Sequence, residues 1–338
     1  MKRVTSRDVA DYVGCSVSAV SLVVNNRHEG RINEQLRDRI LTAVKLLNYR
    51  PNETARSLAT QLRSTIALVC PDIRNPFFGE LFYGLTQAVS GAFGVDLRVG
   101  EEGADYGPQT VDKAQAANIA GLVLANPSRD VLDRFQATCP TVLVDSPDST
   151  LDLVRVDFDI GGAARQLGKH LLENGHLRVG YVDFARHKDT FEQRRGLLGE
   201  VLAAGGAELS GVTAVPEISV GAGLQAFLAV WPEWQRRRIT AIVCADDVLA
   251  YGVISAARRL DIDVPANVSV ASFNDIPFSR LLKPSLTSVG LQAAELGTQA
   301  GQRLLSLIAG KPAASIVLPT ELQLRESSGS APLAPRPS

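Results

Sequence analysis

Acidic and amide side chains follow several apolar runs of the chain, and such groups could bind a metal, transfer protons or hold a polar ligand. They occur at 72–75, Asp145, Asp183, 246–247 and 274–275. An enzyme is one interpretation, but the sequence has no H-x-x-E-H spacing, G-x-S-x-G motif or phosphate-binding glycine loop. We expect no catalysis, metal or cofactor. Instead, Asp247 should cap the helix that follows, and Asp246 should bind a ligand or water.

A second group of side chains forms one face of a helix predicted over residues 17–25. At i, i+1, i+4, i+5 and i+8 this face carries Val17, Ser18, Ser21, Leu22 and Asn25. Small and polar side chains suit a helix that lies in the major groove of DNA. The alternative is a helical hairpin at the end of an ordinary α/β protein, and we favour the helix-turn-helix interpretation.

The residues before this helix can position it. Thr5 and Asp8 form a T-x-x-D capping pattern, which predicts that a first helix begins at Ser6. Gly14 should end that helix, because glycine tolerates a left-handed backbone in a tight turn. The hydroxyl of Ser16 can then cap the second helix.

A third helix is predicted over 33–47, where an apolar stripe would close a small core over the first two helices. In the loop before it, His28 and Arg31 could contact phosphates or be ordinary loop residues, and the sequence does not distinguish the two. The sequence predicts a helical segment over residues 52–59 that is too short to be stable alone, and such a segment could fold on DNA. Leu58 could then wedge between minor-groove base steps, or the segment could be a plain linker with Leu58 resting on the body.

From Ser64 onward, short apolar runs alternate with helical patterns, which predicts parallel sheets covered by helices. The repeating units are too many for one compact sheet, so we expect two lobes with a cleft at the carboxyl ends of the strands. Strands are predicted at 65–71, 121–126, 141–145, 178–183, 241–247 and 269–275, and helices at 78–93, 129–137, 161–174, 193–205, 223–231, 248–260 and 293–309.

Charge is distributed unevenly along the chain. Residues 1–63 carry 11 Lys and Arg against 6 Asp and Glu, and the remainder carries 24 against 30. A basic head on an acidic body is typical of a phosphate-binding domain joined to a body that does not bind phosphate. The sequence has no apolar run long enough to span a membrane and no apolar signal segment, so we expect a cytoplasmic protein rather than a solute-binding protein for transport.

Five motifs, in order, resemble the LacI/GalR family of bacterial transcription regulators over residues 3–328. They are VTSRDVADYVGCSVSAVSLVVN, LNYRPNETARSLA, PDIRNPFF, the series from AIVCADDVLAYG to VSVASFNDIPFSRLLKPSLTSV, and LPTELQLRESS. The resemblance implies a small all-α helix-turn-helix DNA-binding domain with a hinge helix. A two-lobed α/β body like the periplasmic sugar-binding proteins would follow, with parallel sheets and three crossovers.

The resemblance also implies boundaries and partners. The head would span 1–49, the hinge helix 50–63 and the body 64–328, with a disordered tail at 329–338. The lobes would comprise about 64–158 with 290–320, and about 159–289 with 321–328. A homodimer would bind a double-stranded, pseudo-palindromic operator as a repressor, and a small sugar-like effector would change its affinity. The alternatives are an effector-independent regulator of the same fold and, in another class, a solute-binding protein for transport.

On the DNA side, the resemblance assigns base reading to Val17, Ser18 and Leu22. Many members have Arg at the last position, where it reads guanine, and Leu22 can only pack or contact a thymine methyl. Ser16, Ser21 and Asn25 match backbone-positioning roles. Leu58 matches the intercalating leucine, with Ala55 on the same side. The full predicted DNA-binding set is Ser6, Ser16, Val17, Ser18, Ser21, Leu22, Asn25, His28, Arg31, Ala55 and Leu58.

In the cleft, the resemblance assigns effector binding to Asn75, Phe77, Phe78, Asp145, Gln193, Asp246 and Asn274. Three of these positions depart from the family pattern. Gln193 is matched to the family's effector-contacting Arg, Asp246 to an Asn and Asn274 to an Asp. Polar groups beside aromatic faces suit a sugar, and the loss of an Arg would argue against an anionic effector.

Overall fold

The computed structural model describes residues 4–24, 28–49, 63–100, 106–146, 150–185 and 189–332. It divides into two units, residues 1–63 and residues 64–338, which are described separately. Among the described residues, no helix combines the length and apolar character that crossing a membrane requires. The predicted hinge residues Ala55 and Leu58 lie outside the described residues, as does Asn25.

In the first unit the described residues form three helices: α1 (Ser6–Val13), α2 (Val17–Val24) and α3 (Glu34–Leu46). The predicted capping box is present, since Thr5 Oγ1 accepts from Asp8 N while the Asp8 side chain accepts from Thr5 N. Gly14 ends α1 with a φ of 69°, in the left-handed region. Ser16 Oγ accepts from Ala19 N at 3.1 Å, which gives α2 the predicted cap.

The apolar side chains of these helices meet in one small core. Val9, Val13, Val20, Val23 and Ile40 are buried there. The opposite face of α2 is therefore left to solvent, with Val17, Ser18 and Ser21 exposed and Leu22 half-buried. The three-helix arrangement predicted for residues 5–47 is confirmed.

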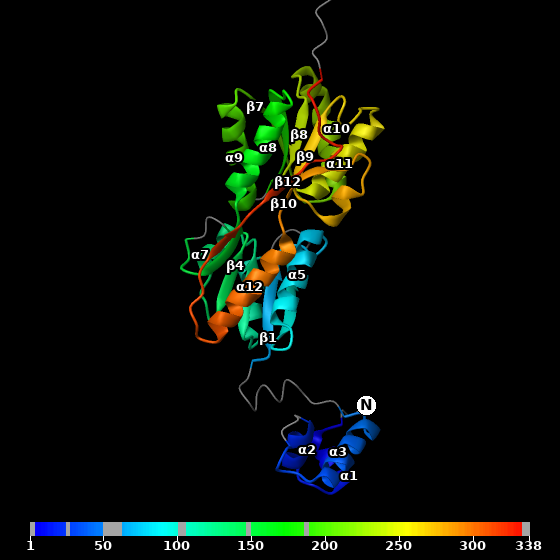
Figure 1. Ribbon diagram of the computed structural model, residues 1–338, viewed down its shortest axis with the longest axis vertical. Helices are drawn as coiled ribbons and strands as arrows, with labels where there is room; N and C mark the ends of the chain where they lie inside the picture. Colours follow the sequence, from blue (N-terminus) through cyan, green and yellow to red (C-terminus); the bar gives the residue numbers. More distant parts are fainter. Residues whose placement is uncertain are drawn as a thin grey trace, which may run out of the picture. The chain divides into compact units, whose positions relative to one another are not determined.

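The second unit contains two six-stranded sheets (Figure 1). The first has the order β11-β5-β4-β3-β1-β2, and all its strand pairs are parallel. Three of its central strands are almost continuously apolar because helices cover both faces. They are β1 (Thr65–Cys70), β2 (Gly94–Val99), β3 (Gly121–Ala125), β4 (Thr141–Val144), β5 (Val154–Phe158) and β11 (Ile316–Leu318).

The second sheet has the order β12-β10-β9-β8-β6-β7. It is parallel except at its edge, where β10 and β12 run antiparallel. Its strands are β6 (Arg178–Phe184), β7 (Glu208–Val215), β8 (Ala241–Cys244), β9 (Ser269–Asn274), β10 (Thr287–Gly290) and β12 (Glu321–Gln323).

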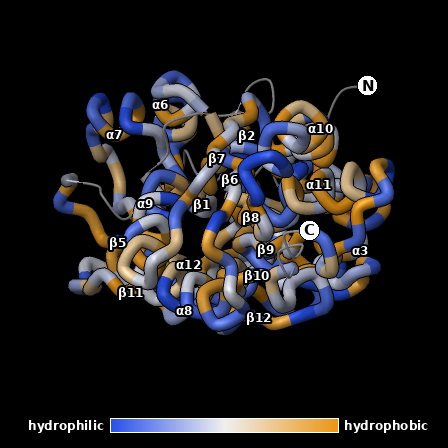
Figure 2. The backbone as a smooth tube through the Cα atoms, turned by 90° about the horizontal axis from the view of Figure 1, so that it is seen from above, coloured by the Kyte–Doolittle hydropathy of each residue, from blue (hydrophilic) through white to orange (hydrophobic). Residues whose placement is uncertain are grey.

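Helices pack on each sheet, and the hydropathy of the tube alternates along many of them because one face is buried (Figure 2). The first sheet carries α5 (Pro76–Val89), α6 (Pro108–Ala116), α7 (Arg129–Arg134) and α12 (Ala293–Ile308), and the second carries α8 (Ile160–Glu173), α9 (Asp189–Ala204), α10 (Val220–Arg236), α11 (Asp247–Arg259) and the 3-10 helix η2 (Pro277–Arg280). Helices α5 and α12 lie side by side (Figure 1). A Cβ on Gly297 of α12 would lie 2.1 Å from Leu81 O of α5, so this contact requires glycine.

Each lobe is built from separate parts of the chain, and the chain passes between the lobes three times. It leaves β5 of the first sheet for α8 of the second lobe, returns from β10 to α12, and crosses again from β11 to β12. The predicted α/β fold with three crossovers is confirmed.

The start of the predicted disordered tail is bound to the second lobe. Gly329 N donates to Ser269 Oγ at 3.0 Å, and Ala331 N donates to Asn174 O at 2.8 Å. His176 Nε2 lies 2.9 Å from Gly329 O. The prediction of disorder is wrong for these residues, because their backbone groups find partners on the lobe, while residues 333–338 lie outside the described part.

Candidate functional site

A cavity lies between the two lobes, at the carboxyl ends of the parallel strands. It contains about 570 Å³ of empty space, part of it open to solvent. Both lobes contribute to its wall, through Pro71, Asp72, Asn75, Phe77, Phe78, Asn126 and Asp145 from the first and Phe184, Phe191, Arg194, Ile218, Asp246 and Asn274 from the second. Of the seven predicted effector residues, six line this cavity and Gln193 does not.

Two aromatic pairs give the cavity apolar surfaces. Phe77 and Phe78, in the first turn of α5, pack edge to face with ring centroids 5.3 Å apart. Phe184, at the end of β6, and Phe191 of α9 do the same at 5.6 Å. Each lobe therefore presents phenyl surface to a ligand, which suits the apolar face of a sugar ring or another flat ligand.

Short polar side chains sit where strands end. Asn126, Asp145 and Asn274 have φ values of 48°, 53° and 117°, a region that Asn and Asp tolerate better than most residues. Asn126 Nδ2 donates to Asp145 Oδ2 at 2.9 Å, so these two strand ends are tied together beside the cavity. Asn126 was not predicted as an effector residue, although it ends a predicted strand as Asp145 does.

Asp246 is almost completely buried, and its carboxylate receives three hydrogen bonds. Oδ1 accepts from Val248 N at 2.8 Å, and Oδ2 accepts from Asn274 Nδ2 at 2.7 Å and from Asn75 Nδ2 at 2.8 Å. Burial raises the pKa of Asp246, and the hydrogen bonds oppose that rise. Because Asn75 lies on the other lobe, its bond spans the cleft.

This arrangement corrects one predicted role. Asp246, rather than Asp247, is the N-cap of α11, because its side chain accepts from Val248 N. Asp247 is the first residue of the helix and its carboxylate is fully buried among serine hydroxyls. The prediction that Asp247 caps the helix is therefore wrong by one residue.

Arg194 is a further cavity residue that was not predicted. Its guanidinium is buried, with Nη1 donating to Ala245 O at 2.8 Å and to Asn274 Oδ1 at 3.3 Å. The guanidinium carbon lies 4.9 Å from the Phe191 ring centroid and 5.5 Å from that of Phe273. Within the described part of the chain, Arg194 Nε is buried without a hydrogen-bond partner, so a ligand acceptor could satisfy it.

The geometry therefore does not support Gln193 as the residue that corresponds to the family's effector-contacting arginine. Helix α9 turns Arg194 toward the cavity with Phe191, whereas Gln193 is half-buried and lies off the cavity wall. The cavity wall thus contains an arginine. The prediction that an anionic effector is disfavoured because this arginine is lost is therefore wrong. Three aspartates still line the wall against this one arginine, although Asp72 is paired with Arg74.

Two other predicted acidic positions are engaged elsewhere. Asp183 is buried and forms an ion pair with Arg195, which lies beside Arg194 in the chain. Asp275 forms an ion pair with Arg325 at 2.6 Å, between the end of β9 and the segment after β12. Neither lines the cavity.

The predicted DNA-binding residues of the head that the structure describes occupy three regions. Val17, Ser18, Ser21 and Leu22 share the outer face of α2, and Ser16 caps that helix. Arg31 is exposed and His28 half-buried in the loop before α3, and Ser6 is half-buried at the start of α1. Their contacts with DNA remain predictions.

Comparisons with known proteins match both units. Residues 5–52 match the family described as bacterial regulatory proteins, lacI family, and residues 169–328 match the periplasmic binding protein-like domain. The HTH-type transcriptional regulator GalR of Escherichia coli strain K12 is 28% identical over 315 residues, covering 91% of this chain and 90% of the relative. The HTH-type transcriptional repressor PurR of Mannheimia succiniciproducens is 29% identical, covering 96% and 98%.

Among solved structures, the lac repressor dimer bound to operator and the anti-inducer ONPF aligns with a TM-score of 0.82 at 22% identity. The alignment covers 97% of this chain and 100% of the repressor chain, and it supports the fold. The sequence relatives are transcription regulators rather than enzymes. Both domains match in this order and relatives align over nearly the whole chain, so the protein is a transcription regulator that joins a lacI-family regulatory domain to a periplasmic binding protein-like domain.

Proposed function

We propose that this regulator represses transcription by binding an operator as a homodimer, and that a polyhydroxylated small molecule in the cleft changes its operator affinity. The observation that carries the proposal is the cavity itself, whose wall is divided between two lobes joined by three crossovers. A relative 28% identical, from Halalkalibacterium halodurans, is named as a ribose operon repressor. A structural neighbour with a TM-score of 0.69 is the regulator CelR in complex with cellobiose.

The cavity wall favours a neutral polar ligand. Asp145, Asn126 and Arg194 offer acceptors and donors for hydroxyl groups, and the four phenylalanine rings can cover the apolar face of a pyranose or furanose. An anion would have one buried guanidinium to pair with, but it would also face the carboxylates of Asp145 and Asp246. Like charges in a poorly solvated site oppose binding, so a neutral sugar is favoured over a sugar phosphate or a carboxylate.

The proposed regulation needs two arrangements of the lobes. The bond between Asn75 and Asp246 holds the cleft closed at one point, and a ligand that replaces or reinforces it would favour one arrangement. Its influence is limited to the difference between its affinities for the two states, typically ~1–3 kcal/mol. In a dimer, this difference would change how well both heads reach a pseudo-palindromic operator.

On DNA, the outer face of α2 would enter the major groove. Val17, Ser18 and Leu22 would contact base edges, while Ser16 and Ser21 would set the register. Because this face has few strong hydrogen-bonding groups, phosphate contacts should supply a large share of the affinity, which should fall steeply with salt.

Two measurements test the proposal. A thermal-shift screen of neutral sugars should find ligands that raise the melting temperature, because binding to the folded state stabilises it by mass action. The same ligands should change the apparent Kd for an operator selected from a random DNA library. Specific operator binding that no sugar alters would contradict effector control, and failure to select any operator would contradict sequence-specific DNA binding.

One observation favours a second candidate, a regulator that needs no effector. Asp246 already has its oxygens occupied by donors from both lobes, so the cleft can close at this point through protein groups alone. Under this alternative, no metabolite raises the melting temperature. The protein's affinity for its operator is then the same with and without metabolites from a cell extract.

A further inference from the structure

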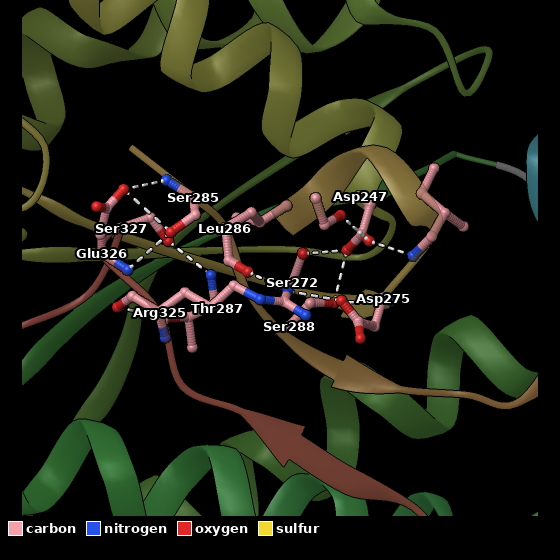
Figure 3. A network of polar contacts seen from close by, with 12 residues as sticks. Asp247, Ser272, Asp275, Ser285, Leu286, Thr287, Ser288, Arg325, Glu326 and Ser327 are labelled. Carbon is pink, nitrogen blue, oxygen red and sulfur yellow. Dashed lines mark hydrogen bonds and ion pairs between the residues drawn. The ribbon is translucent and has the colours of Figure 1, made fainter. Parts of the chain in front are cut away.

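The carboxylate of Asp247 is enclosed in a cage of donors behind the cavity wall (Figure 3). The residue is completely buried, although carboxylates are seldom buried so fully. Oδ1 accepts from the hydroxyls of Ser272 and Ser288, the latter at 2.6 Å. Oδ2 accepts from Ser279 Oγ at 2.5 Å and from Ile276 N at 2.9 Å. Every described contact therefore provides a donor to this carboxylate.

The donors come from separate elements of the second lobe. Ser272 lies in β9, Ser279 in η2, and Ser288 in β10, the strand that leads to the second crossover. Helix α11, which begins at Asp247, is thereby attached to all three elements. A buried network that is fully satisfied holds its members in one arrangement, because any displacement leaves a polar group unpaired.

The cage is continuous with the third crossover. Ser288 Oγ, which donates to Asp247, also accepts from Asp275 N at 3.0 Å. The Asp275 carboxylate pairs with Arg325, in the segment after β12, and Arg325 Nη1 donates to Leu286 O at 2.6 Å. Figure 3 shows the Arg325 side chain extending past β10 toward Asp275. A polar path thus runs from Asp247 to the chain that has just crossed between the lobes.

The cage also touches the cavity through the chain itself. Asp246, which receives the hydrogen bond from Asn75 across the cleft, is covalently adjacent to Asp247. Any shift of Asp246 when the cleft opens must therefore move the first turn of α11 or be resisted by the cage.

We propose that Asp247 is a positioning residue, which couples the state of the cleft at Asp246 to the crossovers at β10 and β12. The serine cage holds the start of α11 rigidly to β10, so that opening or closing the cleft is transmitted to the Asp275–Arg325 pair and the segment beyond it. This inference rests on the proposed control through the cleft, but its test requires neither operator nor effector, so the two can fail separately.

The test measures hydrogen exchange in the full chain. Asn75→Ser keeps a hydroxyl that can cap α5 but is too short to reach Asp246, so it weakens the bond across the cleft. In the otherwise unchanged protein, it should raise the exchange rate of the amides at 322–325 about tenfold. In a Ser272→Ala or Ser288→Ala background, where the cage is incomplete, the same substitution should change that rate less than about twofold.

Ser285→Ala is the matched control. Its hydroxyl bonds Glu326 at 3.0 Å and lies close to the reporting segment, but it has no contact with Asp247. The effect of Asn75→Ser should persist in that background at about tenfold. Equal effects of Asn75→Ser in the cage variants and in the unchanged protein would overturn the proposal. So would an unchanged exchange rate at 322–325 on Asn75→Ser substitution alone.

Discussion

Asn75 and Asp246 belong to opposite lobes and are joined by a 2.8 Å hydrogen bond from Nδ2 to Oδ2. Both side chains are buried, and each also caps a helix, Asn75 at Phe77 N and Asp246 at Val248 N. The polar contact across the cleft is therefore made by residues whose positions are set by the starts of α5 and α11. A hydrogen bond to a charged group is worth about 1.5–3 kcal/mol, enough to bias the two lobe arrangements.

Replacing Asn75 by Asp should separate the lobes at this point. The new carboxylate can still accept from Phe77 N, but it would face Asp246 without a proton to donate. We expect a loss of about 1–3 kcal/mol in the free energy of unfolding at pH 8, measured by urea denaturation. The loss should shrink at pH 5, because a proton shared between the two carboxyl groups restores the bond.

Asn75→Ser serves as the comparison, since it keeps a cap for α5 and adds no charge. It should cost less than the aspartate variant at pH 8, and its cost should change less between pH 8 and pH 5. If the two variants lose the same stability at both pH values, repulsion from Asp246 is not the cause.

Arg194→Lys should weaken binding of any sugar found by thermal shift at least about tenfold, because a lysine cannot keep both the planar stacking on Phe191 and the paired donors of the guanidinium. Operator affinity in the absence of sugar should stay the same. The adjacent Arg195→Lys is the control, since Arg195 pairs with Asp183 and does not line the cavity. Equal loss of sugar binding in both variants would show that Arg194 is not part of the site. We expect Gln193→Ala to have little effect on sugar binding.

The sequence predicts the effector-contacting position at Gln193, whereas the structure has Arg194 on the cavity wall. Phe191, Arg194, Leu198 and Leu202 are buried at spacings of three and four, which is the inner face of α9. Gln193 lies one residue away, about 100° around the helix. The match of Gln193 to the family's arginine does not take the helical period into account, and that period selects Arg194.

Two of the strands that were not predicted, β2 and β7, have a different cause. The apolar runs of β1, β3 and β4 predict buried central strands, and all three are present. The edge strands β2 and β7 were not predicted, because their mixed sequences, GVDLRV and ELSGVTAV, meet solvent on part of their surface. Contacts across the cleft, such as Asn75 with Asp246, join residues 171 positions apart, which local patterns do not predict.

The buried carboxylate of Asp247 predicts a pH dependence of stability. Burial raises the pKa of Asp247 to about 7 from its ordinary value of 3.8, although the hydrogen bonds from Ser272, Ser279 and Ser288 lower it. Between these values the folded protein holds a proton that the unfolded chain has lost, so this group's contribution to stability falls as pH rises toward 7 and is constant above it.

Asp247→Asn isolates this effect, because asparagine does not titrate. The quantity to measure is the difference between the free energies of unfolding of the unchanged protein and of the variant. This difference should fall between pH 5 and pH 7 by up to about 1.4 kcal/mol per pH unit, and it should stay constant above pH 7. A difference that is flat or rises over this range would mean that Asp247 keeps an ordinary pKa. In that case the hydroxyl donors outweigh the burial.

Leu22→Arg should change which operators the protein selects. Leu22 is half-buried on the outer half of α2 and can offer a base only apolar contact. An arginine there can reach the O6 and N7 atoms of guanine with two hydrogen bonds, worth about 1–3 kcal/mol of discrimination. Selection from a randomised half-site library should therefore show a new preference for guanine at one position, while the other positions keep theirs.

Arg31→Ala, in the loop before α3, is the contrasting change. Loss of a phosphate contact should weaken binding to all DNA sequences alike and reduce the salt dependence of binding. A uniform gain of affinity in Leu22→Arg, without a new base preference, would place this residue against the DNA backbone and contradict the docking of α2 in the major groove.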